Sequence, residues 1–210
     1  MLRKGLNDYP NIAIDPESIT ERVDLNAFFK NPGPIDLEVG SGKGTFLVAQ
    51  AQAFPQINYL GIEWANKYYK YAVDRIGRWQ MENVRMLRTD AADFITQFVP
   101  DAAIRMFHLY FPDPWPKKRH HKRRFFCDEN LAQLHRILVP EGIINIATDH
   151  ENYYEQMTEV ALRAIAAGTF KEVEFTRAAG AEEGEWVGTN YERKYIPEGR
   201  NTHILALQKI

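Results

Sequence analysis

Short apolar runs alternate with helix-spaced segments about five times between Ile35 and Ala166, and this alternation limits the possible folds more than any other feature of the sequence. The links are short, so each strand is followed almost directly by a helix that leads back to the start of the next strand. Such a chain forms a parallel sheet covered by helices on both faces. We therefore predict one α/β, doubly wound domain whose sheet is mostly parallel, with an antiparallel strand near the C-terminus.

The expected elements follow from the spacing of apolar residues and from the proline and glycine breaks. The predicted strands are residues 35–39, 57–62, 84–87, 103–111 and 143–147, with strand-like segments at 170–175 and 203–208. The predicted helices are residues 25–30, 45–54, 66–80, 92–99, 128–138 and 151–166. Residues 1–24 are expected to form a loose N-terminal arm before a domain of residues 25–210, and the acidic segment 180–188 a mobile loop.

The chain has 210 residues and a single cysteine, Cys127, so it forms no intrachain disulfide and suits a reducing compartment. The first ten residues lack the apolar stretch of a secretory signal. The longest uncharged run, residues 44–62, contains three glutamines, an asparagine and a proline, which argues against a membrane span. We expect a cytoplasmic protein with no membrane partner, and the sequence leaves both a monomer and a homodimer open.

The formal net charge of −2 argues against a generic nucleic-acid-binding protein, but one short segment is strongly basic. Residues 117–124 read KKRHHKRR, with six Lys or Arg and no acid, which leaves −8 on the rest of the chain. Such a strip on an acidic body attracts a polyanion. A solvated face is the alternative, but the strip follows a predicted ligand-binding edge and we favour phosphate binding. Its two histidines lack a third ligand at metal spacing, so no metal is expected.

A glycine-rich loop follows the first predicted strand, where residues 38–44 read EVGSGKG. The dinucleotide fingerprint requires a third glycine where Thr45 stands, and the phosphate loop requires Ser or Thr directly after Lys43. Neither motif is complete. Glu38 lies just before the loop, where a carboxylate repels phosphate and attracts an ammonium group, so we favour a cofactor that carries an amino acid. The alternative is a turn that merely needs glycines.

Each of the first five predicted strands ends at or near a carboxylate; these are Glu38, Glu63, Asp90, Asp113 and Asp149. Parallel strands bring their carboxyl ends to one edge, where open α/β sheets bind ligands. Glu63 lies 23 residues after Gly40, a separation at which an acid binds ribose hydroxyls in nucleotide-binding folds. Asp90 and Asp149 directly precede helices, so an N-cap is the alternative role for both.

Alternating prolines follow the fourth predicted strand, where residues 111–116 read FPDPWP. Each proline fixes its own φ and keeps the preceding residue out of the helical region, so we expect a stiff, extended segment that presents Asp113 and Trp115. If the strands are ordered 3-2-1-4-5, the glycine loop and Asp113 face one crevice. There Asp113 can accept hydrogen bonds from a flipped-out base, and Trp115 offers a stacking surface. A rigid structural turn is the alternative.

Several motifs together resemble the bacterial tRNA (guanine-N7-)-methyltransferase family. They are LEVGSGKG at 37–44, GIE at 61–63, FPDPWPKKRHHKRR at 111–124, ATDHENY at 147–153 and TNYERKY at 189–195. The resemblance runs from about Leu25 to the C-terminus, and the proline and basic segment is its most specific part. It implies a Rossmann-like class I methyltransferase fold, S-adenosylmethionine as the cofactor, and methyl transfer to N7 of a guanine in the variable loop of tRNA.

The resemblance also implies roles for positions that match the family's motifs, with Asp113 as the catalytic residue. The implied cofactor-binding residues are Glu38, Gly40, Gly42, Gly44, Glu63, Asp90 and Asp113. The implied substrate-binding residues are Lys117, Asp149, Thr189, Asn190, Tyr191 and Glu192. The implied RNA-binding residues are Arg119, His120, His121, Lys122, Arg123 and Arg124.

The expected chemistry needs no general base, because guanine N7 carries a free lone pair and no proton. Catalysis is then mainly positioning, together with negative potential where positive charge passes to the purine. Asp-Pro-Trp-Pro also differs from the Asp-Pro-Pro-aromatic motif of enzymes that methylate exocyclic amines, which favours a ring nitrogen. The alternatives are a methyltransferase of this fold acting on another RNA or on a non-RNA substrate, and a non-enzymatic RNA-binding module. Glu38 and Thr45 disfavour an oxidoreductase.

Overall fold

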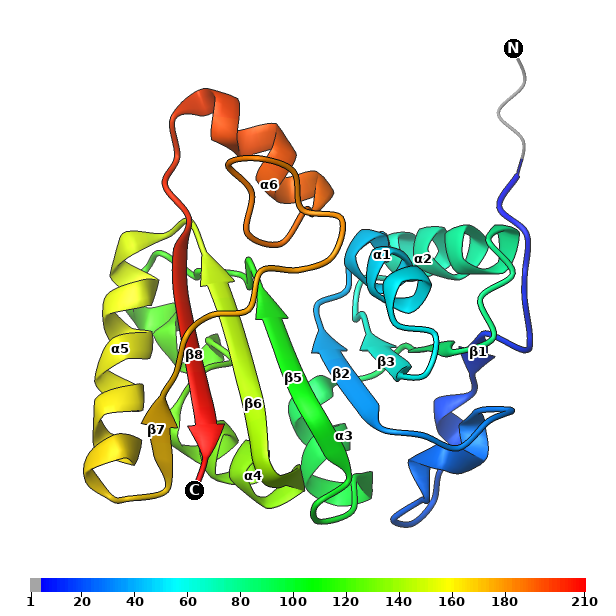
Figure 1. Cartoon of the computed structure of the whole chain (residues 1–210), viewed down its shortest axis with the longest axis horizontal. Coiled ribbons are helices and arrows are strands. Elements are labelled where there is room, and N and C mark those ends of the chain that lie inside the picture. The colour runs from blue at the N-terminus through cyan, green and yellow to red at the C-terminus, as the bar shows by residue number, and fades with distance from the viewer. Residues whose placement is uncertain (1–4) are drawn as a thin grey trace.

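The structure, a computed structural model, describes residues 5–210, which form a sheet of eight strands with helices on both faces (Figure 1). The strands are β1 (Ala13–Ile14), β2 (Ile35–Val39), β3 (Asn58–Ile62), β4 (Val84–Leu87), β5 (Ile104–Tyr110), β6 (Leu138–Thr148), β7 (Phe170–Glu172) and β8 (His203–Lys209). The α-helices are α1 (Thr45–Ala53), α2 (Asn66–Arg78), α3 (Ala91–Phe98), α4 (Asp128–Ile137), α5 (Glu151–Ala166) and α6 (Asn190–Tyr195). Short 3₁₀ helices span Pro16–Ser18, Leu25–Phe28, Lys118–Arg123 and Ile196–Glu198.

The strand order is β1-β4-β3-β2-β5-β6-β8-β7. The pairs from β1 to β6 are parallel, and β8 pairs antiparallel with both β6 and β7, as its reversed arrow shows in Figure 1. The predicted doubly wound sheet with an antiparallel C-terminal strand is therefore confirmed, and the first five predicted strands have the order 3-2-1-4-5. The strand order reverses between the neighbouring parallel strands β2 and β5, and at such a point this architecture has a crevice at the carboxyl ends of the strands.

Two apolar clusters fill the spaces on the two faces of the sheet. One contains residues of α3, α4 and α5, and the other contains residues of α1 and α2. β2 shows how the strand alternation assigns its side chains. Ile35, Leu37 and Val39 belong to the first cluster, whereas Asp36 and Glu38 point to the opposite face, toward α1. A polar pair is thereby placed inside a strand that is buried along its whole length.

Most predicted element bounds agree with the structure within one or two residues, but residues 138–148 differ. The strand predicted at 143–147 begins five residues earlier, because β6 runs continuously from Leu138 to Thr148. Its register with β5 shifts between the pairs Ile104–Leu138 and Met106–Ile143, and Glu141 has a φ of 61°. The extra residues form a bulge in the strand, and this is why proline and glycine occur there without ending it.

The expectation of a loose N-terminal arm is wrong for the part of the arm that the structure describes. Ile12 is 1% exposed, and β1 adds a parallel strand at the edge of β4. The Asn7 backbone N–H donates to Asp74 Oδ1 at 3.1 Å, and the Tyr9 ring lies against Gly77 of α2. Residues 1–4 of the predicted arm lie outside the described residues, and the domain boundary at residue 24 stays a prediction.

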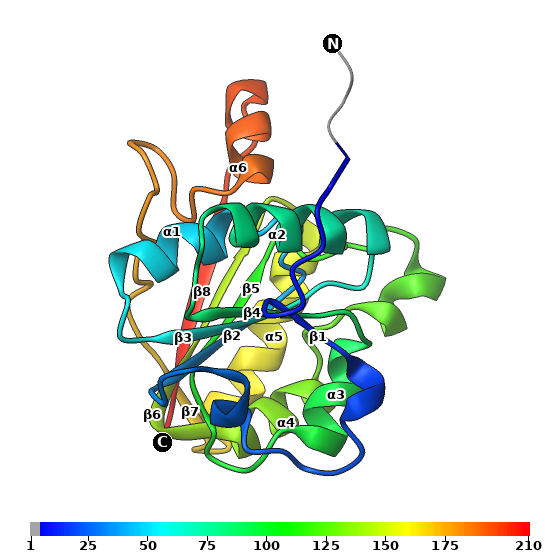
Figure 2. The ribbon, with the colours of Figure 1, turned by 90° about the vertical axis from the view of Figure 1, so that its right-hand side faces the viewer.

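The C-terminal part contains a helix that strand and helix periodicity did not predict. α6 lies beyond the carboxyl ends of β5 and β6, and Figures 1 and 2 both show it projecting from that end of the sheet. It is only six residues long, too short for a periodic pattern to reveal. Within residues 5–210, no helix is both long enough and apolar enough to cross a bilayer.

Candidate active site

The carboxyl ends of five parallel strands meet at one edge of the sheet, as predicted, and α6 lies beyond this edge at β5 and β6 (Figure 1). Glu38 lies near the end of β2 and Glu63 directly follows β3, while Asp113 lies three residues after β5. Burial raises the pKa of Glu63, and the charge of Asp113 raises it further. This influence is consistent with the predicted common edge for the two carboxylates, although fifty residues separate them in the sequence.

The glycine loop joins β2 to α1, and its three glycines all have positive φ: 79° at Gly40, 53° at Gly42 and 69° at Gly44. A Cβ at Gly44 would lie 3.2 Å from the Ala72 Cβ, so this glycine permits close packing of the loop on α2. A Cβ at Gly40 would meet nothing in the described chain within 4 Å, and one at Gly42 only a carbonyl oxygen at 4.0 Å. Two glycines thus border open space where a ligand can approach the backbone.

Glu63 connects the glycine loop to the end of β3. Its Oε2 accepts a hydrogen bond from the Gly42 N–H at 2.8 Å, and its Oε1 accepts one from the Ala65 N–H at 2.7 Å. The residue is 8% exposed. The sequence predicted a ligand contact for this carboxylate. The structure shows that it also has a structural role, because its hydrogen bonds hold the glycine loop in its conformation.

Glu38 is a buried carboxylate that lacks a neutralising partner. It is 3% exposed, and within the described residues its Oε2 makes no hydrogen bond. Burial raises the pKa of Glu38 to about 8, opposed by Ser41 and reinforced by the charge of Glu63. An unpaired buried carboxylate is costly. The ammonium group of an amino-acid cofactor would relieve this cost, so the residues present fit S-adenosylmethionine.

A buried polar network extends from this region beneath α1, and sequence reasoning missed it. His108 Nδ1 lies 2.8 Å from the Tyr110 hydroxyl, and His108 Nε2 lies 3.3 Å from Asp36 Oδ2. Arg105 donates to the same Asp36 oxygen at 2.6 Å. One signal was available in the sequence, because polar residues two apart in the neighbouring buried strands β2 and β5 must share a face. Glu38 lies on the same face of β2 as Asp36, so the network lies on the same side of the sheet as Glu38.

The proline segment after β5 is not extended throughout, which corrects the prediction. Phe111 and Trp115, each followed by proline, have positive φ values of 50° and 44°. Left-handed backbone at such residues is strained and persists where the surroundings enforce it. Asp113 lies between these two bends and is exposed. The bends, rather than stiffness alone, present its carboxylate.

The basic segment forms a 3₁₀ helix from Lys118 to Arg123, with Lys117 exposed just before it. The four side chains Lys118, Arg119, Lys122 and Arg123 are exposed, whereas His120 and His121 are half-buried. The Trp115 ring, predicted to offer a stacking surface, already contacts two side chains of this segment. The Arg123 guanidinium lies 5.0 Å from its centroid, and His120 contacts it edge-on at 5.9 Å.

Arg124 was predicted to bind RNA, but in the structure its side chain is buried. It is 3% exposed, and its guanidinium donates to the Pro114 carbonyl at 2.8 Å, to Gln156 Oε1 at 2.7 Å and to Asn152 Oδ1 at 2.9 Å. It also lies over the Tyr153 ring at 4.7 Å. Arg124 therefore joins the proline segment to α5, and its charge is directed into the protein.

Arg124→Met is expected to lower the free energy of unfolding by about 3 kcal/mol, because it leaves buried acceptors without their donor. Urea unfolding measures this change. Lys122→Met is the matched control, since Lys122 belongs to the same basic segment but is exposed, and it should change stability by less than about 0.5 kcal/mol. Equal stability of the two variants would show that the contacts of Arg124 are not structural.

Asp149 and α6 form the opposite side of the site. Asp149 accepts hydrogen bonds from the Arg200 guanidinium at 2.8 Å and from the Tyr191 hydroxyl at 3.2 Å. The N-cap of α5 is His150, so the alternative role of Asp149 as an N-cap is wrong. The Tyr191 ring lies 5.0 Å from the ring of Phe111. This contact brings the proline segment and the α6 segment together.

The other residues of the TNYE motif differ in exposure. Thr189 caps α6 by accepting from the Glu192 N–H, and Asn190 is exposed. Glu192 is 1% exposed, and its carboxylate accepts from the backbone N–H groups of residues 186, 187 and 188 at 2.7–2.9 Å. Glu192 was expected to contact substrate, but it is buried inside the loop that it holds. The predicted mobile loop 180–188 is thus fixed at its end by Glu192, and Arg193 pairs with its Glu185 at 2.9 Å.

Asp90 is the N-cap of α3, the role that the sequence left as the alternative to ligand binding. Its Oδ1 accepts from the Ala92 and Asp93 N–H groups at 3.0 and 3.1 Å, and so caps α3. A contact of Asp90 with the cofactor stays a prediction. Among residues 5–210, no three or more His, Cys, Asp or Glu side chains form a group that could hold a metal ion.

Comparisons with known proteins agree with this geometry. A family model described as "Putative methyltransferase" matches residues 32–205. A tRNA (guanine-N(7)-)-methyltransferase of Streptococcus thermophilus is 35% identical over 212 residues, covering 98% of this chain and 96% of that protein. A protein of the same name from Ruegeria sp. is 37% identical over 194 residues, covering 90% of this chain and 72% of that protein.

Solved structures of low sequence identity share the fold. A SAM-dependent methyltransferase from Aquifex aeolicus is 16% identical with a TM-score of 0.53, covering 93% of this chain and 88% of that one. A 30S ribosomal A1408 methyltransferase from an uncultured bacterium is 13% identical with a TM-score of 0.57, covering 89% of this chain and 91% of that one. At such identities the likeness concerns the fold alone.

Proposed function

The chain belongs to the bacterial tRNA (guanine-N7-)-methyltransferase family, and on this premise we propose that it methylates N7 of a guanine in the variable loop of tRNA. It is a methyltransferase that uses S-adenosylmethionine, and tRNA is its substrate. The choice of the variable-loop guanine and the roles of individual residues are our inference. Its single cysteine and its tRNA substrate support a cytoplasmic location.

The observation that carries the assignment of the cofactor site is the unpaired carboxylate of Glu38 beside the open side of the glycine loop. Glu38 would hold the ammonium group of the cofactor. Glu63 would accept hydrogen bonds from the ribose hydroxyls while it keeps the loop in place. Gly40 and Gly42 would let the backbone approach the ligand, and Asp90 is the remaining candidate at the end of β4. When bound, S-adenosylmethionine supplies a methyl group on a positively charged sulfur.

Asp113 is the residue we assign to the guanine. Its exposed carboxylate, at the same edge of the sheet as Glu63, would accept hydrogen bonds from the N1 and N2 edge of the base. It would also provide negative potential where the purine becomes positive. N7 carries no proton, so the protein has no proton to remove and acts by orientation, which contributes up to about 7–11 kcal/mol.

We assign the remaining substrate contacts to two sides of the site, the α6 side with Asp149 and the basic segment that follows β5. Lys117, Asp149, Thr189, Asn190 and Tyr191 would contact the nucleotides around the target base. The exposed Lys and Arg of residues 118–123 would contact phosphates, with His120 and His121 at the edge of that surface. Two observations support phosphate binding by these Lys and Arg residues: their side chains are exposed, and the rest of the chain is acidic, so the positive charge is concentrated here.

Methyl transfer from labelled S-adenosylmethionine to unmodified tRNA transcripts tests the function. We expect label at one variable-loop guanine, mapped by cleavage at N7-methylguanine and lost when that base is changed. Cofactor binding without transfer to any tRNA would point to another RNA or to a non-RNA substrate. Absence of cofactor binding in calorimetry would favour a non-enzymatic RNA-binding module.

Lys118→Gln combined with Lys122→Gln is expected to weaken tRNA binding and to flatten its salt dependence. Each lost phosphate contact reduces the slope of log K against log salt by about 0.7–0.9. Filter binding at several salt concentrations measures this slope. Lys171→Gln, which removes one lysine charge at the exposed strand β7, is the control for charge loss outside this segment. An unchanged slope in the double variant would refute the assignment of this surface to RNA.

A further inference from the structure

The outer face of α2 is made of aromatic and basic side chains. Trp64 and Trp79 flank the helix and are 67% and 57% exposed, and Tyr68 and Tyr71 are 44% and 36% exposed. Lys67, Arg75 and Arg78 lie at helical spacing on the same face. We call this set of seven residues the α2 face. Solvent-exposed tryptophans and tyrosines in one stripe are unusual for a purely solvated helix.

The α2 face has no exposed acid within residues 64–79. The helix carries four Lys or Arg and one acid, Asp74. Asp74 is 3% exposed and pairs with Arg78 at 2.7 Å, so it does not offset the charge at the surface. In a chain with a net charge of −2, this makes α2 a second basic surface besides residues 117–124.

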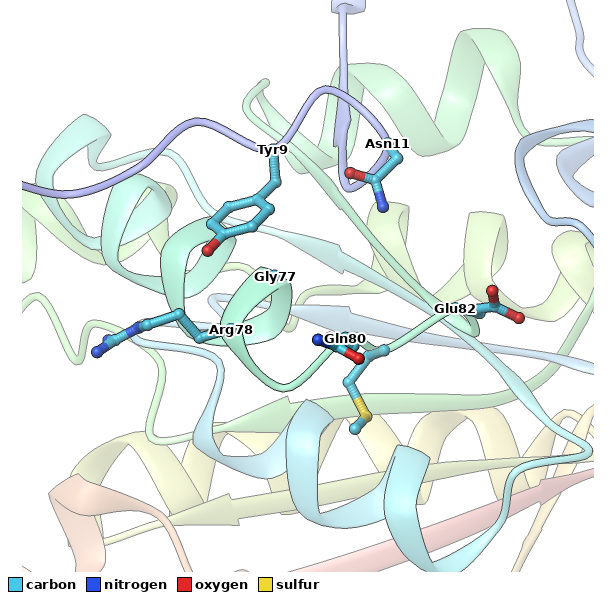
Figure 3. A pocket seen from close by; sticks show the side chains of 7 residues that line it. Tyr9, Asn11, Gly77, Arg78, Gln80 and Glu82 are labelled. Carbon is cyan, nitrogen blue, oxygen red and sulfur yellow. The ribbon is translucent and has the colours of Figure 1, made fainter.

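The other sides of α2 are already occupied. Ala72, Val73 and Ile76 pack in the cluster that covers the sheet. On the flank, the Tyr9 ring lies so close to Gly77 that a Cβ there would be 2.2 Å from it. Figure 3 shows Tyr9 over the end of α2, beside an open cavity of about 490 Å³. The N-terminal segment from residue 5 onward therefore covers one side of the helix, and within residues 5–210 the α2 face is the side left exposed to solvent.

The α2 face begins at the active site. Trp64 directly follows Glu63, and Lys43 of the glycine loop lies 5.7 Å from the centroid of the Tyr71 ring. From there the helix continues for 13 residues, about 20 Å. Figure 2 shows α2 running along the end of the molecule at which α6 projects. A substrate that enters the site from that end would pass along this face.

We propose that the α2 face binds tRNA, stacking unpaired bases on its aromatic rings and contacting phosphates through Lys67 and Arg75. This inference rests on the proposed function and adds a second RNA surface, on the β3 side of the site, to the basic segment on the β5 side. Aromatic rings interleaved with cations are the chemistry that binds single-stranded nucleotides. A second copy of the chain fits less well, because a two-fold contact would place the cations of this face against one another.

Two variants separate the stacking and the charge contributions. Tyr68→Ala with Tyr71→Ala is expected to raise the Kd for tRNA about tenfold without changing its salt slope. Lys67→Gln is expected to reduce that slope by about 0.7–0.9. Phe54→Ala and Lys171→Gln are the matched controls, since both residues are exposed and lie outside α2. Both controls should bind tRNA as the wild type does.

The outcomes distinguish this inference from the proposed function. If the wild-type chain binds S-adenosylmethionine but methylates no tRNA, the proposed function fails. If it methylates tRNA and the α2 variants bind tRNA with unchanged Kd and slope, the α2 inference is overturned. A change in sedimentation with unchanged tRNA affinity would identify the face as a contact between copies of the chain. Cofactor affinity by calorimetry should be unchanged in Lys67→Gln, which shows that its fold is intact.

Discussion

Replacing Asp113 by alanine is expected to lower the rate of methyl transfer at least about 100-fold while tRNA binding persists. The carboxylate would orient the guanine and provide negative potential for the positive charge that develops on it. Both effects grow toward the transition state, so their loss reduces kcat more than it reduces binding. Asp113 is exposed and lies in a loop, so the substitution leaves the buried core unchanged.

Single-turnover methyl transfer and filter binding of tRNA measure the two quantities separately. Glu172→Ala on the edge strand β7 is the matched acidic control and should behave as the wild type. Asp113→Asn keeps the size and one acceptor oxygen but removes the charge, so it should retain part of the orientation and lose the electrostatic part. Equal losses of tRNA binding and methyl transfer in Asp113→Ala would contradict a catalytic role.

Glu38→Gln is expected to weaken cofactor binding and, at the same time, to stabilise the cofactor-free chain at pH 8. The cofactor loses a charge-assisted partner, which corresponds to about 10- to 100-fold in Kd. The free chain loses a buried carboxylate whose Oε2 has no hydrogen bond within the described residues. Both results together would show that Glu38 favours cofactor binding at the expense of stability, as residues of active sites often do.

The pH dependence of stability follows from the direction of the pKa shift. Burial raises the pKa of Glu38 from 4.5 to about 8. Below pH 4.5 the carboxyl group is therefore protonated in both the folded and the unfolded chain, and it does not lower the free energy of unfolding. As the pH rises from 4.5 to 8, the unfolded chain ionises first, and the folded chain loses a few kcal/mol of relative stability. Glu38→Gln removes this loss, so the two proteins should be equally stable at pH 4.5 and differ most at pH 8.

Urea unfolding of both proteins across this range gives the measurement. Glu172→Gln is the control, because Glu172 is exposed and its substitution should leave the pH profile unchanged. Parallel profiles of wild type and Glu38→Gln would show that Glu38 ionises normally in the folded chain. An unchanged cofactor affinity in calorimetry would remove Glu38 from the cofactor site.

Local sequence patterns predicted the scaffold well because they depend on near neighbours in the chain. β2 and β4 have the predicted bounds, and so does α5. The common edge for Glu38, Glu63 and Asp113 followed from the parallel topology alone. The errors arose where distant segments meet. Residues 5–24 were predicted to be loose because their own sequence does not show that the segment around Ile12 pairs with β4 or that Tyr9 packs against α2.

The sequence by itself determined the fold and the family and predicted the edge of the sheet to which we assign the chemistry, because periodicity, glycine spacing and the proline and basic motif are all encoded within short stretches. Only the tertiary structure decided which side chains of those stretches are exposed and which are buried. Arg124 and Lys122 belong to one run of charge, yet Arg124 is buried because Gln156, 32 residues later, receives its guanidinium. Burial is set by partners distant in the chain, and no local spacing contains that information.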